Sequence, residues 1–377
     1  MKATAVIGAN FGDEGKGAVT AHLVGAAPAT SIVVRFNGGA QAGHTVVTPR
    51  RRHVFHHFGS GTLAGAASFL SRHFIVNPFL WEKERDELGH AELLVDPSAM
   101  LTTPFDMLLN QVAERKRGDG RHGSCGIGIN ATVTRCQSLM TSAGMTRDTD
   151  QLRDTLIRIR TDYLPARVVT LGLAGDTWLD EYAHSDRLLD SYLEACDRFA
   201  RNVAWAEERD LRSFSHVIFE GAQGLLLDET HRYFPHVTRS RTGLTNVAGL
   251  CERIGLDTLD AVYVTRSYMT RHGRGPFLTE DPTMRFADAT NIPNEWQGTL
   301  RFGTLDVDLL EESITNDLRG AATLNVNLRV SASIAMTCLD QHEFDLDRLP
   351  LPVRYIGRGE GRLAESEATA MAVAGTQ

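Results

Sequence analysis

Short apolar runs rich in β-branched residues recur along the chain, each followed by a glycine-rich or polar turn. Uninterrupted runs of this length are typical of parallel strands that are covered on both faces. They occur at Val6–Ile7, Ser31–Val34, Leu93–Val95, Arg167–Leu171, His216–Phe219, Ala261–Val264 and Ser333–Met336. Helical patterns alternate with them, at Pro104–Lys116, Asp150–Asp162, Asp186–Glu208 and Val307–Leu318. The alternation predicts an α/β fold with a mostly parallel central sheet flanked by helices, and with functional loops at the carboxyl ends of the strands.

Length and composition set the expected domain boundary. With 377 residues, of which 42% are hydrophobic, the chain can bury a large core. We expect one large α/β domain over residues 1–362. The remaining residues, 363–377, are rich in Ala, Ser, Glu and Thr, which predicts a flexible or frayed helical tail.

Charge and cysteine usage exclude some classes of function. A net charge of −8 argues against a general nucleic-acid-binding surface. There is no signal-peptide pattern and no apolar run of transmembrane length, so we expect a cytoplasmic protein without a membrane partner. The five cysteines are odd in number and lack CxxC spacing, which fits reduced thiols and no zinc site.

The first apolar run leads into the turn Gly8-Ala-Asn-Phe-Gly-Asp13-Glu-Gly-Lys16-Gly17. Closely spaced glycines allow backbone N–H groups to converge on an anion, and a helix predicted over Ala18–Leu23 would add its N-terminal dipole. The ordinary P-loop pattern is not met, because position 17 is Gly where that pattern has a magnesium-binding Ser or Thr. Asp13 is therefore a candidate metal ligand, and its alternative role is that of a helix cap.

A second glycine-rich turn follows the second apolar run. It reads Asn37-Gly-Gly-Ala-Gln41-Ala-Gly43-His44-Thr45 and ends in a histidine and a threonine. Because both turns follow parallel strands, they can face one site.

Motifs in both turns, and several later ones, resemble the adenylosuccinate synthetase family. The motifs that carry this resemblance are Gly12–Gly17, Gly38–Thr45, Phe219–Gly224, Pro235–Thr238, Thr270–Glu280, Thr337–Asp340 and Tyr355–Arg362. They occur in the family's order between about residues 3 and 362. The resemblance implies a C–N ligase that joins L-aspartate to a 6-oxopurine nucleotide through a 6-phosphoryl intermediate.

The same resemblance implies roles for the first two turns. Asp13 would be the base that takes the purine N1 proton and also a Mg²⁺ ligand, with the carbonyl of Gly43 as a further ligand. His44 would donate to the 6-oxygen or to the transferring phosphoryl group. The implied triphosphate contacts are Gly12, Gly15, Lys16, Gly17 and Thr45, with Asp340, Gln341 and Gly357 at the base.

A second set of residues matches the family's site for the nucleotide monophosphate. Its members are Asn37, Gln41, Ser124, Arg135, Gln223, Thr238 and His272. Arg135 resembles the arginine that enters the neighbouring subunit's site, which implies a homodimer, although its spacing from Gly126 is two residues short. The alternative for Arg135 is a surface ion pair. Aspartate would be bound by Gln297, Gly298, Thr299 and Arg301.

The departures from the usual family motifs fall at ligand positions and favour a phage-type branch, the 2-aminoadenylosuccinate synthetases. That branch uses dGMP as the acceptor, and Gly123-Ser124 would supply space and an acceptor for the guanine 2-amino group. Some of its members carry Ser where this chain has Asp13, so an adenylosuccinate synthetase using IMP and GTP remains the alternative. A non-ligating nucleotide-binding protein or ATPase is the second alternative.

The donor nucleotide is a separate prediction. Asp340 alone would favour guanine, whereas Gln341 can offer both a donor and an acceptor to an adenine edge. Cys338 occupies the position of the family's lysine. We expect ATP or dATP to be used at least as well as GTP.

Overall fold

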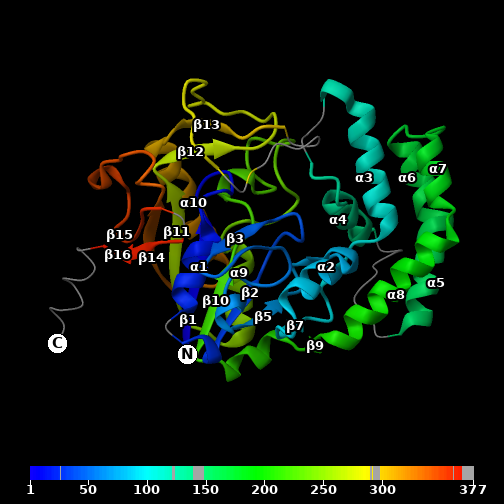
Figure 1. Cartoon of the computed structure of the whole chain (residues 1–377), viewed down its shortest axis with the longest axis horizontal. Coiled ribbons are helices and arrows are strands. Elements are labelled where there is room, and N and C mark those ends of the chain that lie inside the picture. Colours follow the sequence, from blue (N-terminus) through cyan, green and yellow to red (C-terminus); the bar gives the residue numbers. More distant parts are fainter. Residues whose placement is uncertain are drawn as a thin grey trace.

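A computed structural model describes residues 1–25, 27–120, 124–138, 148–288, 291, 298–359 and 361–366. Its centre is a ten-stranded sheet (Figure 1). The strands lie in the order β16 (Leu363–Glu365), β15 (Val353–Gly357), β14 (Arg329–Thr337), β11 (Thr258–Arg266), β1 (Lys2–Gly8), β10 (His216–Glu220), β2 (Ser31–Arg35), β5 (Ala67–Leu70), β7 (Leu93–Val95) and β9 (Ala204–Trp205). Every neighbouring pair is parallel except β15 and β16. The predicted mostly parallel sheet is confirmed.

Three two-stranded sheets lie outside the central one. They pair β12 (Tyr268–Arg271) with β13 (Arg301–Thr304), β3 (His44–Val47) with β4 (Arg52–Phe55), and β6 (Ile75–Val76) with β8 (Met100–Leu101). The helices are α1 (Lys16–Val24), α2 (Pro78–Leu88), α3 (Pro104–Arg117), α4 (Ile129–Gln137), α5 (Thr149–Arg158), α6 (Leu164–Thr170), α7 (Thr177–Ala183), α8 (Asp186–Asn202), α9 (Leu244–Ile254) and α10 (Val307–Leu324).

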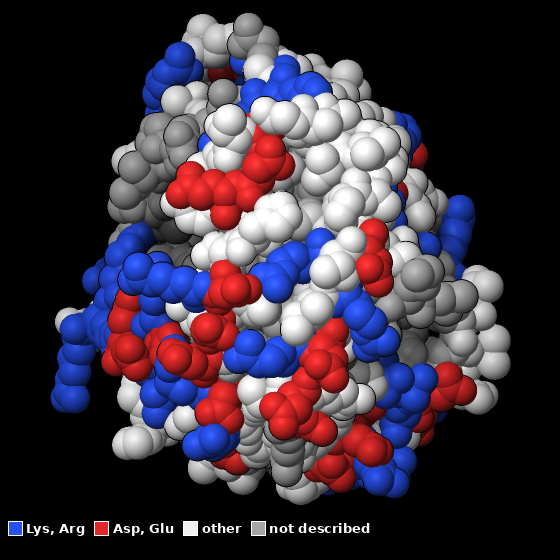
Figure 2. All heavy atoms as spheres, turned by 90° about the vertical axis from the view of Figure 1, so that its right-hand side faces the viewer, with Lys and Arg blue, Asp and Glu red and all other residues white. Residues whose placement is uncertain are grey.

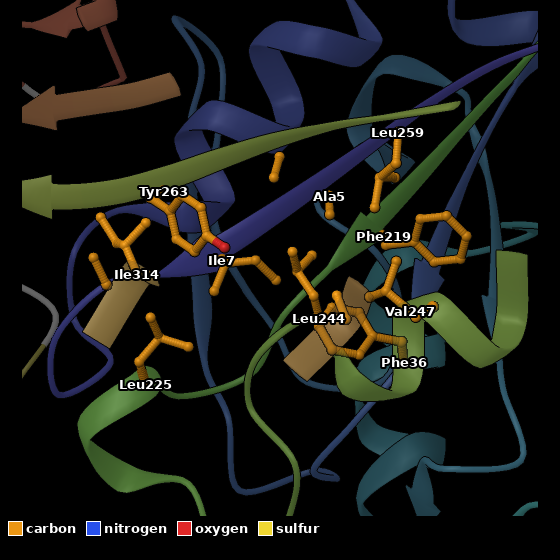
Figure 3. Packing of buried hydrophobic residues seen from close by; sticks show 14 of the residues in the cluster. Ala5, Ile7, Phe36, Phe219, Leu225, Leu244, Val247, Leu259, Tyr263 and Ile314 are labelled. Carbon is orange, nitrogen blue, oxygen red and sulfur yellow. The ribbon is translucent and has the colours of Figure 1, made fainter. Parts of the chain in front are cut away.

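The central strands are buried on both faces because helices cover each side. Successive side chains of a strand point to opposite faces. Ala5 and Ile7 of β1 pack in the cluster that holds Leu244 of α9 and Ile314 of α10 (Figure 3). Val6 packs on the other side with Val19 of α1. This two-sided burial explains why the strands appear in the sequence as continuous apolar runs.

A second apolar cluster joins the helices drawn to the right of the sheet in Figure 1. Trp81 of α2, Leu108 of α3 and Phe199 of α8 belong to it. The face seen in Figure 2 carries basic and acidic side chains interspersed with one another. Surface pairs such as Arg153–Asp190 and Arg198–Glu82 contribute to this mixture.

One predicted strand is wrong. Arg167–Leu171 lies in and just after helix α6, which begins with a proline in its first turn and continues a helical run from α5 through a π-helical turn at Ile159–Tyr163. Val169 is 74% exposed, so this β-branched run covers a helix surface and is not sandwiched between layers. The other six runs form strands, as predicted.

Two predicted boundaries also differ. The helix expected over Asp186–Glu208 ends at Asn202, whose side-chain amide donates to the carbonyl of Arg198, and β9 follows. Residues 363–365, assigned to the tail, form β16 along the edge of the sheet. The rest of the tail from residue 367 lies outside the described residues. Within the described part of the chain, no helix combines the length and apolar character needed to cross a membrane.

Candidate active site

The loops with the predicted functional residues meet at the carboxyl edge of the sheet. In the sheet β1 lies between β10 and β11, β2 lies beside β10, and β14 lies beside β11. The segments that leave these parallel strands therefore emerge along one edge. They carry the first turn, the second turn, Gln223, and the turn at Asp340.

The first turn is held by its own carboxylate. Glu14 accepts hydrogen bonds from the backbone N–H groups of Asn10 (3.1 Å) and Gly12 (2.7 Å). Lys16 Nζ lies 3.1 Å from the other oxygen of Glu14 and donates to the carbonyl of Gly12 at 2.6 Å. Gly8 is required here, because a Cβ atom at that position would lie 2.5 Å from the carbonyl oxygen of Gln223 and 2.6 Å from Glu14. Glu14 therefore stabilises the turn, while Lys16 stays beside the N-terminus of α1.

Asp13 differs from its neighbour Glu14 because its carboxylate projects out of the turn. Its side chain is 27% exposed, and Oδ2 lies 3.4 Å from Nε2 of His272. The main-chain carbonyl of Asp13 accepts a hydrogen bond from Arg266. The carboxylate is thus accessible to a ligand while its backbone is fixed.

His44 is held by a buried carboxylate that the sequence argument did not assign. His44 Nδ1 lies 2.9 Å from Glu220 Oε1, and Glu220 Oε2 accepts from the backbone N–H of Ser60 at 3.1 Å. Arg35 Nε lies 4.0 Å from the same carboxylate. Glu220 follows Phe219 in the motif that carries the resemblance, so the motif was a signal, but nothing in the sequence links it to His44.

Burial controls the charge of this pair. Burial lowers the pKa of His44 to about 4, against an opposing contribution from Glu220. Burial by itself raises the pKa of Glu220, but His44 and Arg35 lower it to about 2. His44 Nε2 has no hydrogen-bond partner among the described residues. A neutral ring that donates from Nδ1 to Glu220 can only accept at Nε2, so donation to a ligand requires the imidazolium form.

The two glycine-rich turns contact each other. A Cβ atom at Gly17 would lie 2.8 Å from the carbonyl oxygen of Thr45 and 3.1 Å from Ser60 Oγ. A cavity of about 390 Å³ borders this contact, lined in part by Ala18, Val47 and Arg362. The expectation that the two turns face one site is met for Gly17, His44 and Thr45.

Two glutamines of the predicted monophosphate site converge. A Cβ atom at Gly38 would lie 3.2 Å from Gln223 Oε1 and 3.4 Å from Gln41 Nε2. Gln223 Oε1 and both amide atoms of Gln41 are buried and have no hydrogen-bond partner in the described part of the chain. Buried amides are normally satisfied, so these are the groups that a ligand would pair.

Asn37 holds the two loops together. Its amide donates to the carbonyl of Ala222 at 3.1 Å and accepts from the N–H of Ala222 at 2.7 Å. The N–H of Gly38 donates to Ser240 Oγ at 2.9 Å. Thr238 lies two residues before Ser240, with its own N–H bonded to the carbonyl of Leu227. Asn37 thus shapes a cradle formed by Gly38, Ala222 and Ser240, and Thr238 lies near this cradle in the sequence.

Ser124 and His272 take different places from the one expected. Ser124 Oγ accepts from Asn110 Nδ2 at 2.8 Å in the loop before α4. That loop adjoins the cradle indirectly, since a Cβ atom at Gly39 would lie 3.0 Å from Ile129 at the start of α4. His272 Nε2 lies 3.4 Å from Asp13 Oδ2 and 3.0 Å from Asn291 Oδ1.

The expectation that Arg135 reaches a neighbouring subunit stays a prediction, although the side chain has buried partners within its own subunit. Its guanidinium is fully buried and bonds Asp106 at 2.9 Å and the carbonyl of Leu101 at 2.6 Å. The surface ion pair considered as the alternative is wrong, because the pair is buried. Arg135 connects α4 to the start of α3 inside the subunit.

The aspartate-binding prediction is partly described. Arg301 bonds Glu280 at 2.6 Å and the carbonyl of Gly275 at 2.7 Å, while Gly298 and Thr299 precede it on the surface. Gln297 lies outside the described residues. Arg271 lies opposite Arg301 across the β12–β13 pair and was missed by the sequence argument. Burial and the neighbouring Arg301 lower the pKa of Arg271 to about 10.

The turn predicted for the donor base adjoins the first turn. The N–H of Leu339 donates to the carbonyl of Gly357 at 3.2 Å, which brings Asp340 and Gly357 into one region. A Cβ atom at Gly15 would lie 3.3 Å from Thr337. Gln341 Oε1 accepts from the hydroxyl of Tyr268 at 2.5 Å. The residues predicted to contact the triphosphate thus come from two neighbouring regions, the first turn and the turn at Asp340.

The available donors fit magnesium better than zinc. No group of three or more His, Cys, Asp or Glu side chains suited to a metal occurs among the described residues. Mg²⁺ commonly takes one or two protein oxygens and completes its shell with phosphates and water. The exposed carboxylate of Asp13, with the carbonyl of Gly43, matches that requirement.

These features define an α/β protein with a glycine-rich turn before helix α1, a ligand-accessible carboxylate and an oriented histidine at the carboxyl edge of its sheet. The sequence model of adenylosuccinate synthetase matches residues 5–360. The chain therefore belongs to the adenylosuccinate synthetase family, a family of C–N ligases.

Individual relatives show the same relationship. The chain is 31% identical over 300 residues to the adenylosuccinate synthetase of Clostridium botulinum (strain Eklund 17B / Type B), covering 74% of this chain and 66% of that protein. It is 28% identical over 358 residues to the Borrelia turicatae (strain 91E135) enzyme, covering 87% and 77%. The chain thus spans about two thirds to three quarters of these proteins.

Two solved structures share the fold. A fully ligated adenylosuccinate synthetase from Plasmodium falciparum superimposes with a TM-score of 0.70 at 18% identity, covering 97% of this chain and 99% of the other. The succinoaminodeoxyadenylate synthetase of cyanophage S-2L, bound to dGMP and to dATP as an energy donor, gives 0.62 at 14% identity, covering 100% and 99%. At these identities the likeness shows the fold alone.

Proposed function

We propose that the protein joins L-aspartate to C6 of dGMP while a nucleoside triphosphate is cleaved to the diphosphate and phosphate. The product is N6-succino-2-amino-2'-deoxyadenylate, a precursor of 2-aminoadenine DNA. The observation that carries the ligase assignment is that a partly exposed carboxylate, Asp13, and an oriented histidine, His44, lie on two glycine-rich turns that contact each other.

The reaction divides into two steps that these residues can assist. Asp13 takes the N1 proton of the purine, so that negative charge develops on O6, which attacks the γ-phosphorus and releases the diphosphate. The amine of aspartate then displaces phosphate from C6. Mg²⁺ held by Asp13 and the Gly43 carbonyl would neutralise charge on the phosphates when bound. Lys16 and the N-terminus of α1 stabilise the phosphoryl group during transfer.

Gln41 and Gln223 are the groups best suited to hold the acceptor base. The buried, unpaired amide of Gln41 and Oε1 of Gln223 offer a donor and acceptors to a purine edge. Thr238 and the Ser240 cradle at Gly38 would take the 5'-phosphate side. Aspartate would bind beside the Arg271–Arg301 pair, where two cations face two carboxylates.

The choice of dGMP rests on the departures in the sequence, and the shared fold of the cyanophage enzyme is compatible with it. IMP with GTP is the alternative acceptor and donor pair. A homodimer remains part of the proposal, although Arg135 does not support it. The donor assignment rests on Gln341, whose Oε1 accepts from Tyr268 and whose Nε2 donates to the carbonyl of Ala287. The amide can still accept one more hydrogen bond at Oε1 and donate one more from Nε2, and an adenine edge needs one of each.

An end-point assay separates these possibilities. dGMP, GMP, IMP and dIMP are each incubated with aspartate and either ATP or GTP. We expect product from dGMP, with ATP at least as effective as GTP. Product only from IMP would overturn the acceptor assignment. A tenfold or larger preference of kcat/KM for GTP, about 1.4 kcal/mol, would overturn the donor assignment. Phosphate release that does not depend on aspartate would favour the non-ligating alternative.

A further inference from the structure

Arg266 occupies the end of β11, between the first turn and the turn at Gln341. Its side chain is largely buried and uses each nitrogen of the guanidinium. Nε donates to the main-chain carbonyl of Asp13 at 2.5 Å, NH1 to the hydroxyl of Tyr268 at 3.1 Å, and NH2 to Asp288 Oδ2 at 3.0 Å. Only the planar fork of an arginine can make these three bonds at once.

The bond to Tyr268 continues to the predicted donor-base turn. The Tyr268 hydroxyl accepts from Arg266 and donates to Gln341 Oε1 at 2.5 Å. Its ring stacks on Phe286 with centroids 4.0 Å apart, so the hydroxyl has little freedom to move. A rotation of the Gln341 amide therefore changes the hydrogen bonding of Tyr268 and, through it, of Arg266.

The bond to Asp288 returns to Asp13 by a second route. Asp288 accepts from the side-chain amide of Asn291 at 2.9 Å, and Asn291 Oδ1 lies 3.0 Å from His272 Nε2. The same His272 nitrogen lies 3.4 Å from Asp13 Oδ2. The backbone and the carboxylate of Asp13 are thus both connected to one guanidinium, in a ring of hydrogen bonds that is closed by the 3.4 Å contact between His272 and Asp13.

We propose that Arg266 is a positioning residue that couples recognition of the donor base at Gln341 to the placement of Asp13. A correctly bound base fixes the Gln341 amide, which fixes the Tyr268 hydroxyl and leaves Arg266 aligned with Asp13. A base that rotates the Gln341 amide weakens the hydrogen bond between Gln341 and Tyr268, which is the first link between the donor base and Asp13. This inference rests on the proposed function, because it takes Gln341 as a donor contact and Asp13 as the base.

A kinetic double-mutant cycle tests the coupling without removing the buried arginine. Tyr268→Phe removes the hydroxyl that links Arg266 to Gln341 and keeps the ring stacked on Phe286. Gln341→Ala removes the other end of the same link. At saturating substrates we expect each single variant to lower kcat by roughly 3- to 10-fold, in line with the loss of one hydrogen bond. The double variant should fall no further than the less active single variant, because both changes break one link.

Two further readouts distinguish coupling from damage. In the wild-type protein kcat should depend on whether ATP or GTP is the donor, and in Tyr268→Phe the two kcat values should converge while their KM values stay different. Tyr263→Phe is the matched control, since it removes a different buried tyrosine hydroxyl, which lies on β11 and bonds Asp317 at 2.9 Å. It should lower stability and leave kcat and the donor dependence unchanged.

The outcomes separate this inference from the proposed function. If the two single effects on kcat multiply in the double variant, or if Gln341→Ala changes only KM, the coupling is wrong while the ligase assignment stands. If Asp13→Asn retains full aspartate-dependent turnover, the proposed function fails first. Arg266→Lys provides a conservative check, because it keeps the charge but cannot make all three bonds, and we expect its kcat to fall with a smaller change in KM.

Discussion

Buried polar groups at the carboxyl edge of the sheet differ in their hydrogen bonding from the buried Arg135–Asp106 pair in the helical region around α3 and α4. At the edge, His44 Nε2, the amide of Gln41 and Oε1 of Gln223 are buried without a partner among the described residues. Around α3, the guanidinium of Arg135 is bonded to Asp106 and to a carbonyl. An unpaired buried polar group costs free energy, so it persists where a ligand will complete it. The comparison supports the proposal that the edge binds the ligand and that Arg135 belongs to the scaffold.

The sharpest test of the edge is the base. Asp13→Asn keeps the shape of the side chain but removes the proton acceptor, so turnover should fall by about 10²–10⁴-fold. Binding of dGMP, measured calorimetrically, should change far less. If the Asp13→Asn variant turns over within about tenfold of the wild-type rate, Asp13 does not act as the base.

The matching test of the scaffold removes Arg135. Arg135→Met leaves the buried carboxylate of Asp106 without its cationic partner, with only the hydrogen bonds from Thr103, which should lower the free energy of unfolding by about 3–5 kcal/mol. Adding Asp106→Asn should recover part of that loss. Arg153→Met, which breaks an exposed pair with Asp190, is the control and should cost about 1 kcal/mol or less. Denaturant titration measures the free energy of unfolding of each variant. If Arg135→Met loses activity without losing stability, Arg135 acts in the active site and not in the scaffold.

A smaller effect is expected where an edge residue is itself oriented by a buried carboxylate. Glu220→Gln removes the charge that holds His44 Nδ1, and loss of a hydrogen bond to a charged group is worth about 1.5–3 kcal/mol, or roughly 10- to 100-fold in kcat. Glu84→Gln changes another buried glutamate beside a histidine and should affect stability without lowering kcat. Equal losses of kcat in both variants would contradict an orienting role for Glu220.

The smallest effect concerns pH. Burial raises the pKa of Asp317 to about 6, above the value near 3.9 of an unfolded aspartate. The folded protein then binds more protons than the unfolded chain between these values, so this group's contribution is full below about pH 4 and declines as pH rises toward 6. Asp317→Asn, which can still pair with Leu244 N–H and the Tyr263 hydroxyl, should gain stability relative to the wild type by about 1–3 kcal/mol at pH 8 and little at pH 4. A stability difference that does not vary with pH would contradict the raised pKa.

The parts of the structure that could be predicted from sequence are those encoded locally. Gly12 and Lys16 stand in a glycine-rich turn that is compatible with anion binding, the role of His44 was implied by the resemblance to the family, and strands buried on both faces have continuous apolar runs. Arg167–Leu171 shows the limit of that signal, because β-branched residues also cover the exposed side of a helix.

Roles that arise from tertiary contacts could not be predicted. Glu220, Arg266 and Arg271 become informative only when strands far apart in the sequence are paired. The buried pairing of Arg135 was not predicted for the same reason, since its partner Asp106 lies on another helix and nothing in the sequence around Arg135 indicates this partner.

Glu14 fills the anion-binding turn of its own chain with a carboxylate. It accepts the N–H groups of Asn10 and Gly12 and contacts Lys16. An incoming phosphate must compete with a negative group that is covalently attached and therefore always present at high effective concentration. A nucleoside triphosphate offsets this competition through its base and its other phosphates, whereas released inorganic phosphate has no such contacts. On the proposed function, the turn would favour retention of the intact donor over rebinding of the phosphate that the reaction releases, which would limit inhibition by that product.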